Sequence, residues 1–288
     1  MPPVIGDFIR LSRPKHWVKN VFVFLPVPFA MAAGAHIDVW AFGAGLAAFC
    51  LGSSAVYSFN DAQDAERDRM HETKRHRPVA AGRISRGAAY AWSALLAALA
   101  FALALTAGRT GALELLAIYV GLNLFYSMGA KHIPLLDVFL LSSWYMLRVL
   151  LGCALLEVSA SNWLLVCSGA LALFISMAKR RADVVAGLDE DHRPALRGYN
   201  EAFLDQAIGV CASITIVAYA LYTMEAAVLI PGRQFASLPF VVFGVLEYLR
   251  GTHVRRSGGS PVDEVLGSPQ LLVAGAGWLA ATLWSLRI

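Results

Sequence analysis

Long apolar runs dominate this chain and limit what it can fold into. A helix needs about 17–25 predominantly apolar residues to cross a bilayer, and runs of this kind recur along the whole sequence. Pro26 and Pro28 interrupt the first run, and Glu247 lies within the eighth. We predict nine membrane-spanning helices, over residues 20–36, 39–59, 88–107, 111–129, 134–156, 162–178, 207–229, 235–249 and 270–286.

Composition excludes the alternatives to a membrane protein. Only 15% of the residues are charged and 58% are hydrophobic, whereas a soluble domain has about 25% charged and about 45–50% apolar residues. So few charges cannot cover the surface of a water-soluble fold of 288 residues. The alternation of apolar and polar residues is too poor for an outer-membrane barrel. We therefore expect an all-α, polytopic membrane protein that forms a single domain over residues 1–288.

The basic residues gather on one side of the predicted spans. Twenty of the 24 lysine and arginine residues lie in the segments 1–19, 60–87, 130–133, 179–206 and 250–269. Because cytoplasmic loops carry an excess of lysine and arginine, this bias places the N-terminus and the long loops in the cytoplasm. An odd number of spans then places the C-terminus outside. We expect a multi-pass protein of the inner (plasma) membrane, with its chemistry at the cytoplasmic surface.

An acidic cluster directly follows the second predicted span. If the helix continues, Asn60, Asp64 and Asp68 recur every four residues, and Asp61 lies on nearly the same stripe. Like charges at this spacing repel one another, and a divalent cation removes the repulsion. Mg²⁺ prefers oxygen ligands and often binds one or two carboxylates together with substrate phosphates. We therefore predict a Mg²⁺ site here, rather than a solvated acidic helix face, with the ligands Asn60, Asp61, Asp64 and Asp68.

A basic segment comes next in the sequence. Lys74, Arg75 and Arg77 follow the acidic cluster closely, and their side chains suit the phosphate oxygens that a metal ion leaves free. Positive-inside topology alone would also place lysine and arginine here. Topology explains the sign of the charge but not the adjacent aspartates. Carboxylates followed by cations indicate a site for a metal-bound polyanion.

These motifs resemble those of a known family. The pattern Asn60-Asp61-x-x-Asp64-x-x-x-Asp68 is similar to the first aspartate-rich motif of the UbiA superfamily of intramembrane prenyltransferases. Other segments, within a resemblance that runs from about residue 8 to residue 285, are similar to the decaprenyl-phosphate phosphoribosyltransferase branch. They are RPKHWVKN from Arg13, TKRHRPVAAG from Thr73, Lys131-His132 with Asp137 and Arg148, KRRAD from Lys179, and RGYN from Arg197 with Phe203-Leu204-Asp205.

The resemblance implies a fold and a reaction. Members bundle nine spans around a central cavity. The branch transfers 5-phosphoribosyl from phosphoribosyl pyrophosphate to a polyprenyl phosphate, with Mg²⁺ as cofactor, and the lipid product feeds synthesis of an arabinofuranose donor. Many other members carry a second aspartate-rich motif, DxxxD, after the sixth span, whereas here Gly187 stands four residues after Asp183. This departure weakens a two-metal prenyl-diphosphate site and fits the phosphoribosyl branch.

Roles follow for the polar residues of the site. Asp61, Asp64 and Asp68 are expected to be catalytic, because the metal ion that they hold would stabilise the leaving diphosphate. Tyr126 fits a polar contact with substrate as well as it fits a plain core aromatic. The residues expected to bind substrate are Lys15, Lys19, Asn60, Lys74, Arg75, Arg77, Tyr126, Lys131, His132, Arg148, Lys179, Arg180 and Asp183.

Arg148 lies deep inside the fifth predicted span. A lone charge at the centre of a spanning helix costs about 2.5–3.5 kcal/mol on insertion scales, so we expect Arg148 to face the cavity and to have a partner. Glu114, Glu247 and an incoming phosphate are the candidates. The sequence leaves open whether Arg148 binds substrate or forms a structural ion pair.

Two other functions account for part of the pattern. An aromatic prenyltransferase of the same superfamily would use an isoprenyl diphosphate with the same carboxylates, but the additional cations indicate more phosphate than that reaction involves. An anion transporter would place ionisable residues near the midplane on broken helices and polar loops on both faces, whereas here the charges gather on one side. The sequence indicates no nucleic-acid partner, and it leaves the oligomeric state open, a homo-oligomer included.

Overall fold

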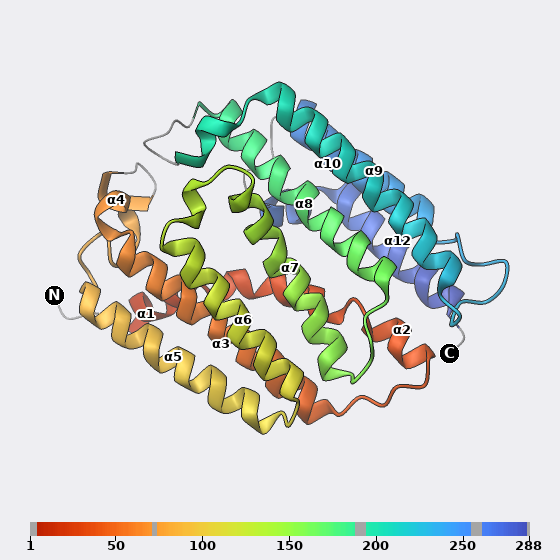
Figure 1. Cartoon of the computed structure of the whole chain (residues 1–288), viewed down its shortest axis with the longest axis horizontal. Helices are drawn as coiled ribbons and strands as arrows, with labels where there is room; N and C mark the ends of the chain where they lie inside the picture. The colour runs from red at the N-terminus through yellow and green to blue at the C-terminus, as the bar shows by residue number, and fades with distance from the viewer. Residues whose placement is uncertain (1–4, 71–73, 188–193, 255–260, 287–288) are drawn as a thin grey trace.

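The computed structural model describes residues 5–70, 74–187, 194–254 and 261–286. Every element in these ranges is helical, apart from an isolated β-bridge between Leu229 and Leu286, so the expected all-α class is confirmed (Figure 1). The elements are α1 (Ile5–Ser12), the 3₁₀ helix η1 (Pro14–Phe24), α2 (Val27–Ala32), α3 (Val39–Gln63), α4 (Ala65–Met70), η2 (Lys74–His76), α5 (Arg86–Thr106), α6 (Thr110–Ser127), η3 (Ala130–His132), α7 (Leu136–Leu155), α8 (Asn162–Val185), η4 (Pro194–Gly198), α9 (Glu201–Glu225), α10 (Leu238–Val254), α11 (Pro261–Gly267) and α12 (Pro269–Ser285).

Six helices in the described part of the chain are long and apolar enough to cross a membrane. They are α3, α5, α6, α7, α8 and α9, with 18 to 25 residues each, and they correspond to the second to seventh predicted spans. The helices at the eighth and ninth predicted spans, α10 and α12, have 17 residues each. The predicted number of nine spanning helices is therefore not confirmed within the described residues.

The first predicted span, residues 20–36, is wrong as a continuous helix. It is divided between the end of η1 and the six-residue helix α2, with Pro26 between them. Proline has no backbone N–H to donate inside an α-helix and clashes with the preceding turn, so Pro26 and Pro28 permit only a short helix here. The 3₁₀ helix η1 runs for 11 residues, although 3₁₀ helices longer than three or four residues are uncommon.

The 3₁₀ helix η1 packs against α3 and α7. A Cβ atom added at Gly152 of α7 would lie 2.1 Å from the carbonyl oxygen of Val23. Glycine is thus required at this position, because any side chain would push η1 away from α7. Close packing at Gly152 brings the N-terminal motif into the bundle.

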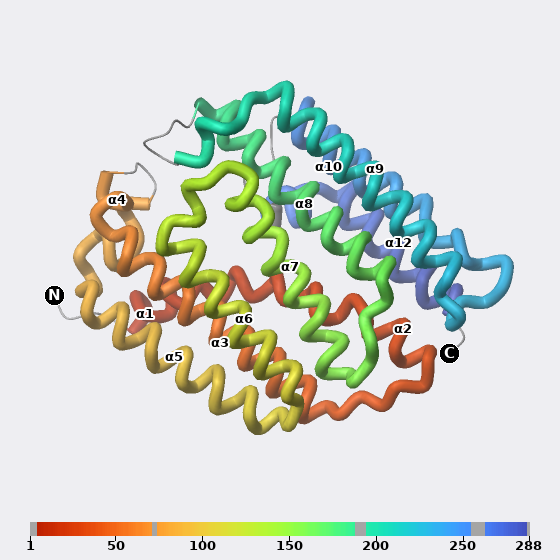
Figure 2. The backbone as a smooth tube through the Cα atoms, in the orientation of Figure 1, coloured from red at the N-terminus to blue at the C-terminus, as the bar shows by residue number. Residues whose placement is uncertain are grey.

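Two apolar cores hold the long helices together. The first joins α3, α5, α6 and α7, with Phe49 and Leu116 among its buried side chains. The second joins α8, α9 and α10, with Phe174 and Leu204 among its buried side chains. Because α7 and α8 also pack against each other, the two halves form one bundle whose long helices run side by side (Figure 2).

The short polar elements gather at one end of this bundle. Helix α4, the α6–α7 connection and the α8–α9 connection lie at that end, whereas α2 and the last turn of α12 lie at the other (Figure 2). The predicted basic loops therefore share one end, which we call the polar end. Most of the side chains expected to do chemistry come from these connections and from the adjoining helix turns, whereas Lys15 and Lys19 lie in η1 and Arg148 lies within α7.

Candidate active site

The acidic cluster lies where α3 meets α4 at the polar end. Helix α3 ends at Gln63 and α4 begins at Ala65, with a bend at Asp64 between them. The backbone N–H of Asp64 donates to the carbonyl of Asn60, and that of Asp68 donates to the carbonyl of Asp64, both at 2.9 Å. The four-residue spacing is thus retained, but the expected straight continuation of the helix is wrong. The bend turns the acidic side chains toward different partners.

Asp61 and Asp68 share one cation. The Nη1 atom of Arg77 lies 3.1 Å from Oδ1 of Asp61 and 2.7 Å from Oδ2 of Asp68, and Arg13 forms a second ion pair with Asp61. Both aspartates are buried, with exposures of 2% and 5%. Two buried carboxylates therefore converge on a single guanidinium nitrogen.

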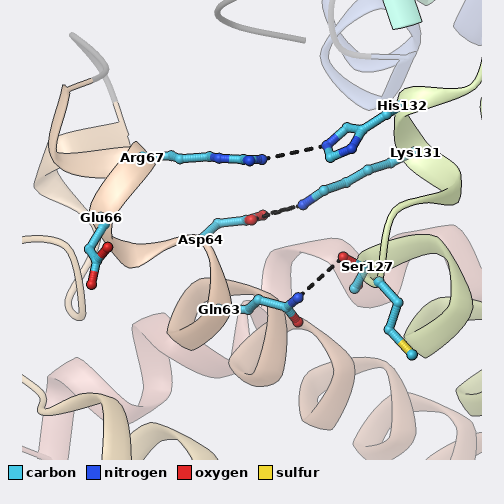
Figure 3. Close-up of a pocket in the computed structure, with 8 residues that line it drawn as sticks. Gln63, Asp64, Glu66, Arg67, Ser127, Lys131 and His132 are labelled. Carbon is cyan, nitrogen blue, oxygen red and sulfur yellow. Dashed lines mark hydrogen bonds and ion pairs between the residues drawn. The ribbon is translucent and has the colours of Figure 1, made fainter. Parts of the chain in front are cut away.

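Asp64 faces a different partner across a pocket. The Nζ atom of Lys131 lies 2.8 and 3.0 Å from the two carboxylate oxygens of Asp64, and His132 lies 3.5 Å from Arg67. Figure 3 shows Lys131 and His132 reaching from the α6–α7 connection toward the α3–α4 junction. The pocket between them has a volume of about 280 Å³ and is lined by Gln63, Asp64, Glu66, Arg67, Ser127, Met128, Lys131 and His132.

Asn60 and Gln63 fix the end of α6 against α3. The Oδ1 atom of Asn60 accepts a hydrogen bond of 2.5 Å from the Ser127 hydroxyl, and Nε2 of Gln63 donates to the Ser127 carbonyl at 3.2 Å. Because Lys131 follows Ser127 closely in sequence, these bonds also determine where the α6–α7 connection crosses the pocket. Asn60 thus has a structural partner in addition to its predicted role as a metal ligand.

The carboxylates fit a metal ion only in part. Within the described residues, no three aspartate, glutamate, histidine or cysteine side chains are grouped as they would be around a metal. Asp61 and Asp68 nevertheless converge on one cationic nitrogen, and Mg²⁺ commonly takes two carboxylates and leaves its other positions to phosphate oxygens. The carboxylate oxygens of Asp61 and Asp68 are therefore suitable ligands for Mg²⁺, which would take the place of the Arg77 nitrogen. Ligation by Asn60 and Asp64 stays a prediction.

The 3₁₀ geometry of η1 sorts the N-terminal motif into three faces, because residues three apart align in such a helix. One face is exposed, and it carries the predicted substrate ligand Lys15. A second face packs inward, where the Trp17 indole donates to Ser54 at 3.0 Å and Asn20 is buried. The third face carries Arg13, His16 and Lys19. A spacing of three residues is the sequence signal for this arrangement, but only Lys15 and Lys19 of this motif were assigned roles from the sequence, and Arg13 and His16 were missed.

Arg13 and His16 flank the same ring of α3. Arg13 adopts a left-handed backbone conformation with φ 50° and ψ 56°, which costs a residue other than glycine about 1–2 kcal/mol. Its guanidinium lies 5.3 Å from the centre of the Tyr57 ring, and the His16 ring meets Tyr57 edge-on at 5.2 Å. The turn at Arg13 thus brings the third face of η1 to the carboxylates of α3.

Cations from several elements surround His16. Burial and the nearby cations Lys19, Arg13, Lys179 and Arg77 lower the pKa of His16 to about 4, so the imidazole is neutral near pH 7. Its Nδ1 atom is buried and accepts or donates no hydrogen bond among the described residues. Three predicted phosphate ligands, Lys19, Arg77 and Lys179, are therefore brought together from three separate elements.

Arg180 and Asp183 belong to a buried network that joins α7, α8 and the segment before α9. Arg180 is fully buried, with Nε at 2.6 Å from Asp137 and Nη1 at 2.7 Å from Asp183. The Tyr199 hydroxyl donates to the other Asp137 oxygen at 2.5 Å and accepts from the Leu135 N–H at 2.6 Å. Burial and the bond to the Asp137 carboxylate raise the pKa of Tyr199. The predicted contacts of Arg180 and Asp183 with substrate stay predictions.

Arg148 lies within α7 and is 3% exposed. Its Nε donates to Oδ1 of Asn20 at 2.8 Å, and its Nη1 donates to the Trp144 carbonyl at 2.6 Å. Among the described residues, no carboxylate lies within ion-pair distance of Arg148. The predicted partner Glu247 instead pairs with Arg250 at 2.7 Å, and Glu114 forms no ion pair with Arg148 either. The expectation of an acidic partner on either glutamate is therefore wrong.

The remaining predicted ligands are Tyr126, Lys74 and Arg75, and all three lie in the described ranges. Tyr126 is buried and packs edge-on against Trp144, with ring centres 5.1 Å apart. Lys74 and Arg75 lie in η2, where Arg75 is exposed. Thr73, which opens the second basic motif, is outside the described residues.

Comparison with known proteins places the chain in a family. Residues 20–246 match the UbiA prenyltransferase family. A decaprenyl-phosphate phosphoribosyltransferase from Corynebacterium glutamicum is 33% identical, over 100% of this chain and 89% of the relative. A protein of the same name from Mycobacterium tuberculosis is 28% identical, over 97% of this chain and 94% of the relative.

Solved structures share the fold. A UbiA homologue from Archaeoglobus fulgidus bound to DMAPP and Mg²⁺ superposes with a TM-score of 0.75, over 96% of this chain and 99% of the homologue, at 17% identity. A digeranylgeranylglyceryl phosphate synthase superposes with a TM-score of 0.70, over 98% of each chain, at 15% identity. The chain is a multi-pass membrane protein that belongs to the UbiA prenyltransferase family, in its decaprenyl-phosphate phosphoribosyltransferase branch.

Proposed function

We propose that this protein transfers 5-phosphoribosyl from phosphoribosyl pyrophosphate to a polyprenyl phosphate of the decaprenyl-phosphate type. One observation carries the proposal: Asp61 and Asp68 pair with Arg13 and Arg77, and these two arginines lie with Lys19 and Lys179 around His16. A reaction that joins two phosphate-bearing substrates requires this much positive charge. The names of the relatives from Corynebacterium and Mycobacterium support the same substrates.

The transfer is a displacement at C1 of the ribose. The bond from C1 to an oxygen of the acceptor phosphate forms while the bond from C1 to the diphosphate breaks, and the electron pair leaves with the diphosphate. C1 gains oxocarbenium character, as in other glycosyl transfers. Because the acceptor phosphate is ionised near neutral pH, the step needs no general base. The protein's task is to bring the anions together and to stabilise the departing charge.

Asp61 and Asp68 would hold Mg²⁺, which supplies positive charge to the leaving diphosphate. The Arg77 guanidinium, which pairs with both carboxylates in this structure, would bind diphosphate oxygens in a bidentate manner. Lys131 and His132 reach the same region from the other wall of the pocket, where they can bind a further phosphate. The site thus uses cations from both halves of the bundle.

We further propose that the protein lies in the inner membrane with the polar end in the cytoplasm. The excess of lysine and arginine in the loops at that end supports this orientation, and phosphoribosyl pyrophosphate is a soluble donor that would approach from there. Asp61 of α3 and Lys179 of α8 both contribute to the site, which supports one functional domain over the whole chain. The product, a 5-phosphoribosyl-1-phosphoryl-polyprenol, would feed synthesis of an arabinofuranose donor.

Membranes that contain the protein test the proposal. We expect label from phosphoribosyl pyrophosphate to enter the lipid fraction when a polyprenyl phosphate is present, and EDTA to abolish the transfer. Membranes without the protein are the control. Transfer of a prenyl group from an isoprenyl diphosphate to hydroxybenzoate, without phosphoribosyl transfer, would replace this function with that of an aromatic prenyltransferase.

A further inference from the structure

Arg148 carries a buried charge that no described carboxylate balances. Removal of an ion from water costs several kcal/mol even in a real protein interior. Aromatic rings offset part of this cost, because the guanidinium carbon lies 5.5 Å from the centre of Phe49, 5.3 Å from Tyr119 and 6.0 Å from Tyr145. Each such contact contributes about 0.5–2 kcal/mol. The surroundings accept a cation but do not neutralise it.

The guanidinium is held in place from two sides. Asn20 of η1 accepts from Nε at 2.8 Å, and its own Nδ2 donates to Sγ of Cys50 on α3 at 2.9 Å. The Trp144 carbonyl, one turn earlier on α7, accepts from Nη1 at 2.6 Å. A long flexible side chain is thereby fixed before any ligand binds, which lowers the entropy cost of binding.

Arg148 lies deeper in the bundle than the carboxylates. Phe49, which contacts its guanidinium, precedes Asp61 on α3 by about 18 Å of helix at 1.5 Å per residue. A displacement at C1 requires the attacking oxygen to approach from the side opposite the departing diphosphate. If Asp61 and Asp68 mark the diphosphate at the polar end, the attacking phosphate lies on the membrane side of the ribose. Arg148 lies on that side, next to Phe49.

We propose that Arg148 binds the phosphate monoester of the lipid acceptor on the membrane side of the site. This inference rests on the proposed function and specifies where the second substrate binds. Arg148 contacts the phosphate oxygens, and Asn20 acts as a positioning residue that holds the guanidinium. The surrounding rings exclude water, so the ion pair forms in a medium of low dielectric and is strong. The isoprenoid chain then stays among apolar side chains within the bilayer.

Kinetics of full-length Arg148→Gln and Arg148→Lys variants test the assignment. We expect Arg148→Gln to raise the KM for polyprenyl phosphate at least about tenfold and to leave the KM for phosphoribosyl pyrophosphate within about twofold. Arg148→Lys should recover part of the loss, because it keeps the charge but not the planar fork. Arg233→Gln is the matched control, since Arg233 also stacks on an aromatic ring, Trp284 at 4.2 Å, but at the opposite end.

Two results would overturn the assignment. A raised KM for phosphoribosyl pyrophosphate with an unchanged KM for the lipid would place the 5-phosphate of the donor at Arg148 instead. Unchanged KM values with a lowered thermal midpoint would make Arg148 a structural residue. If Arg148→Gln does not fold, Asn20→Ala keeps the cation and should raise the KM for the lipid about threefold, and an unchanged lipid KM in that variant would count against the proposal.

A binding experiment without donor separates this inference from the proposed function. The thermal midpoint of the wild-type protein in detergent is measured with polyprenyl phosphate and with the corresponding polyprenol. We expect a larger stabilisation by the phosphate, and we expect Arg148→Gln to abolish the difference. This outcome would support the phosphate site even if the protein transfers no phosphoribosyl group. Equal shifts by the two lipids would contradict the site, whatever the reaction is.

Discussion

Arg180 and Arg148 are both buried in the bundle, but their surroundings differ. Arg180 is fully buried between the carboxylates of Asp137 and Asp183. Arg148 is 3% exposed and contacts an amide, a backbone carbonyl and three aromatic rings. The counter-charge of Arg180 thus belongs to the protein, whereas the described residues supply none for Arg148, and we propose that a ligand does. Burial alone does not separate a structural arginine from a binding one, but the identity of its partners does.

The two arginines predict opposite consequences of substitution. Loss of one partner from a buried ion pair leaves an uncompensated charge and destabilises a protein by about 3–5 kcal/mol. Loss of a buried cation that has no counter-ion also removes the cost of its desolvation. Such a substitution should therefore change stability less, and ligand affinity more, than loss of one partner from a buried ion pair. Substitutions in the Arg180 network should therefore lower the free energy of unfolding, whereas substitutions of Arg148 should raise the KM for the lipid substrate.

Asp137→Asn should have the largest effect on stability. It removes one of the two carboxylates that balance Arg180, and we expect the free energy of unfolding to fall by about 3–5 kcal/mol. Unfolding in a detergent series, monitored by circular dichroism, measures the change. Asp38→Asn is a control, since Asp38 is half exposed and 3.7 Å from Arg109 and should cost less than about 1 kcal/mol. Equal effects of the two variants would contradict a special role for the buried pair.

Asp68→Asn should have the largest effect on turnover. Asp68 and Asp61 share Arg77, so the counter-charge of Asp68 in this structure also comes from the protein. We propose that Mg²⁺ takes the place of Arg77 in the working enzyme. We expect kcat to fall about 100-fold, and the thermal midpoint to fall less than in Asp137→Asn, because Arg77 keeps its ion pair with Asp61 and its side chain is 30% exposed. Glu157→Gln is the control, because Glu157 is 64% exposed, pairs with Arg109 and does not line the pocket. Near-normal turnover of Asp68→Asn would rule out the metal assignment.

The sequence was sufficient for the long helices and for the composition of the site. Helices α3 and α5 to α9 follow from apolar runs whose length is set by the bilayer, and the acidic and basic motifs at the polar end are visible as residue types. The bend at Asp64 was not predictable in this way, because it depends on partners such as Lys131, 67 positions away. The same applies to Arg180 and Asp137, whose contact depends on how α8 is rotated against α7.

The N-terminal motif shows a different limit of sequence reasoning. Its residues were noticed, but a 3₁₀ helix of 11 residues was not expected, because such helices are usually short. With the period of an α-helix, Lys15 and Lys19 share a face. With the period of three that the structure has, Lys15 is exposed, and Lys19 aligns with Arg13 and His16.

Tyr199→Phe should have a smaller effect that sharpens the comparison. It removes the hydrogen bond to Asp137 and the one that the hydroxyl accepts from the Leu135 N–H, but it leaves both carboxylates and Arg180 in place. Hydrogen bonds to charged groups contribute about 1.5–3 kcal/mol, so we expect a loss of stability below that of Asp137→Asn. The same unfolding series provides the measurement. A loss as large as that of Asp137→Asn would mean that the hydroxyl, rather than the charge pair, holds the network.

His16 offers the smallest effect and tests whether the cations around it bind an anion. Burial and the neighbouring cations lower its pKa to about 4, from an ordinary value of 6.5. Between these values the unfolded chain binds the additional proton, so stability falls as the pH is lowered through this window. We expect the thermal midpoint of His16→Gln to fall less than that of the wild type between pH 6.5 and pH 4.

Inorganic pyrophosphate, which would bind Lys19 and Lys179, should reduce the difference between the two proteins, because a bound anion favours the protonated imidazole. A difference that is unaffected by pyrophosphate would mean that these cations bind no diphosphate. Their counter-charge would then come from the protein itself, as it does for Arg180.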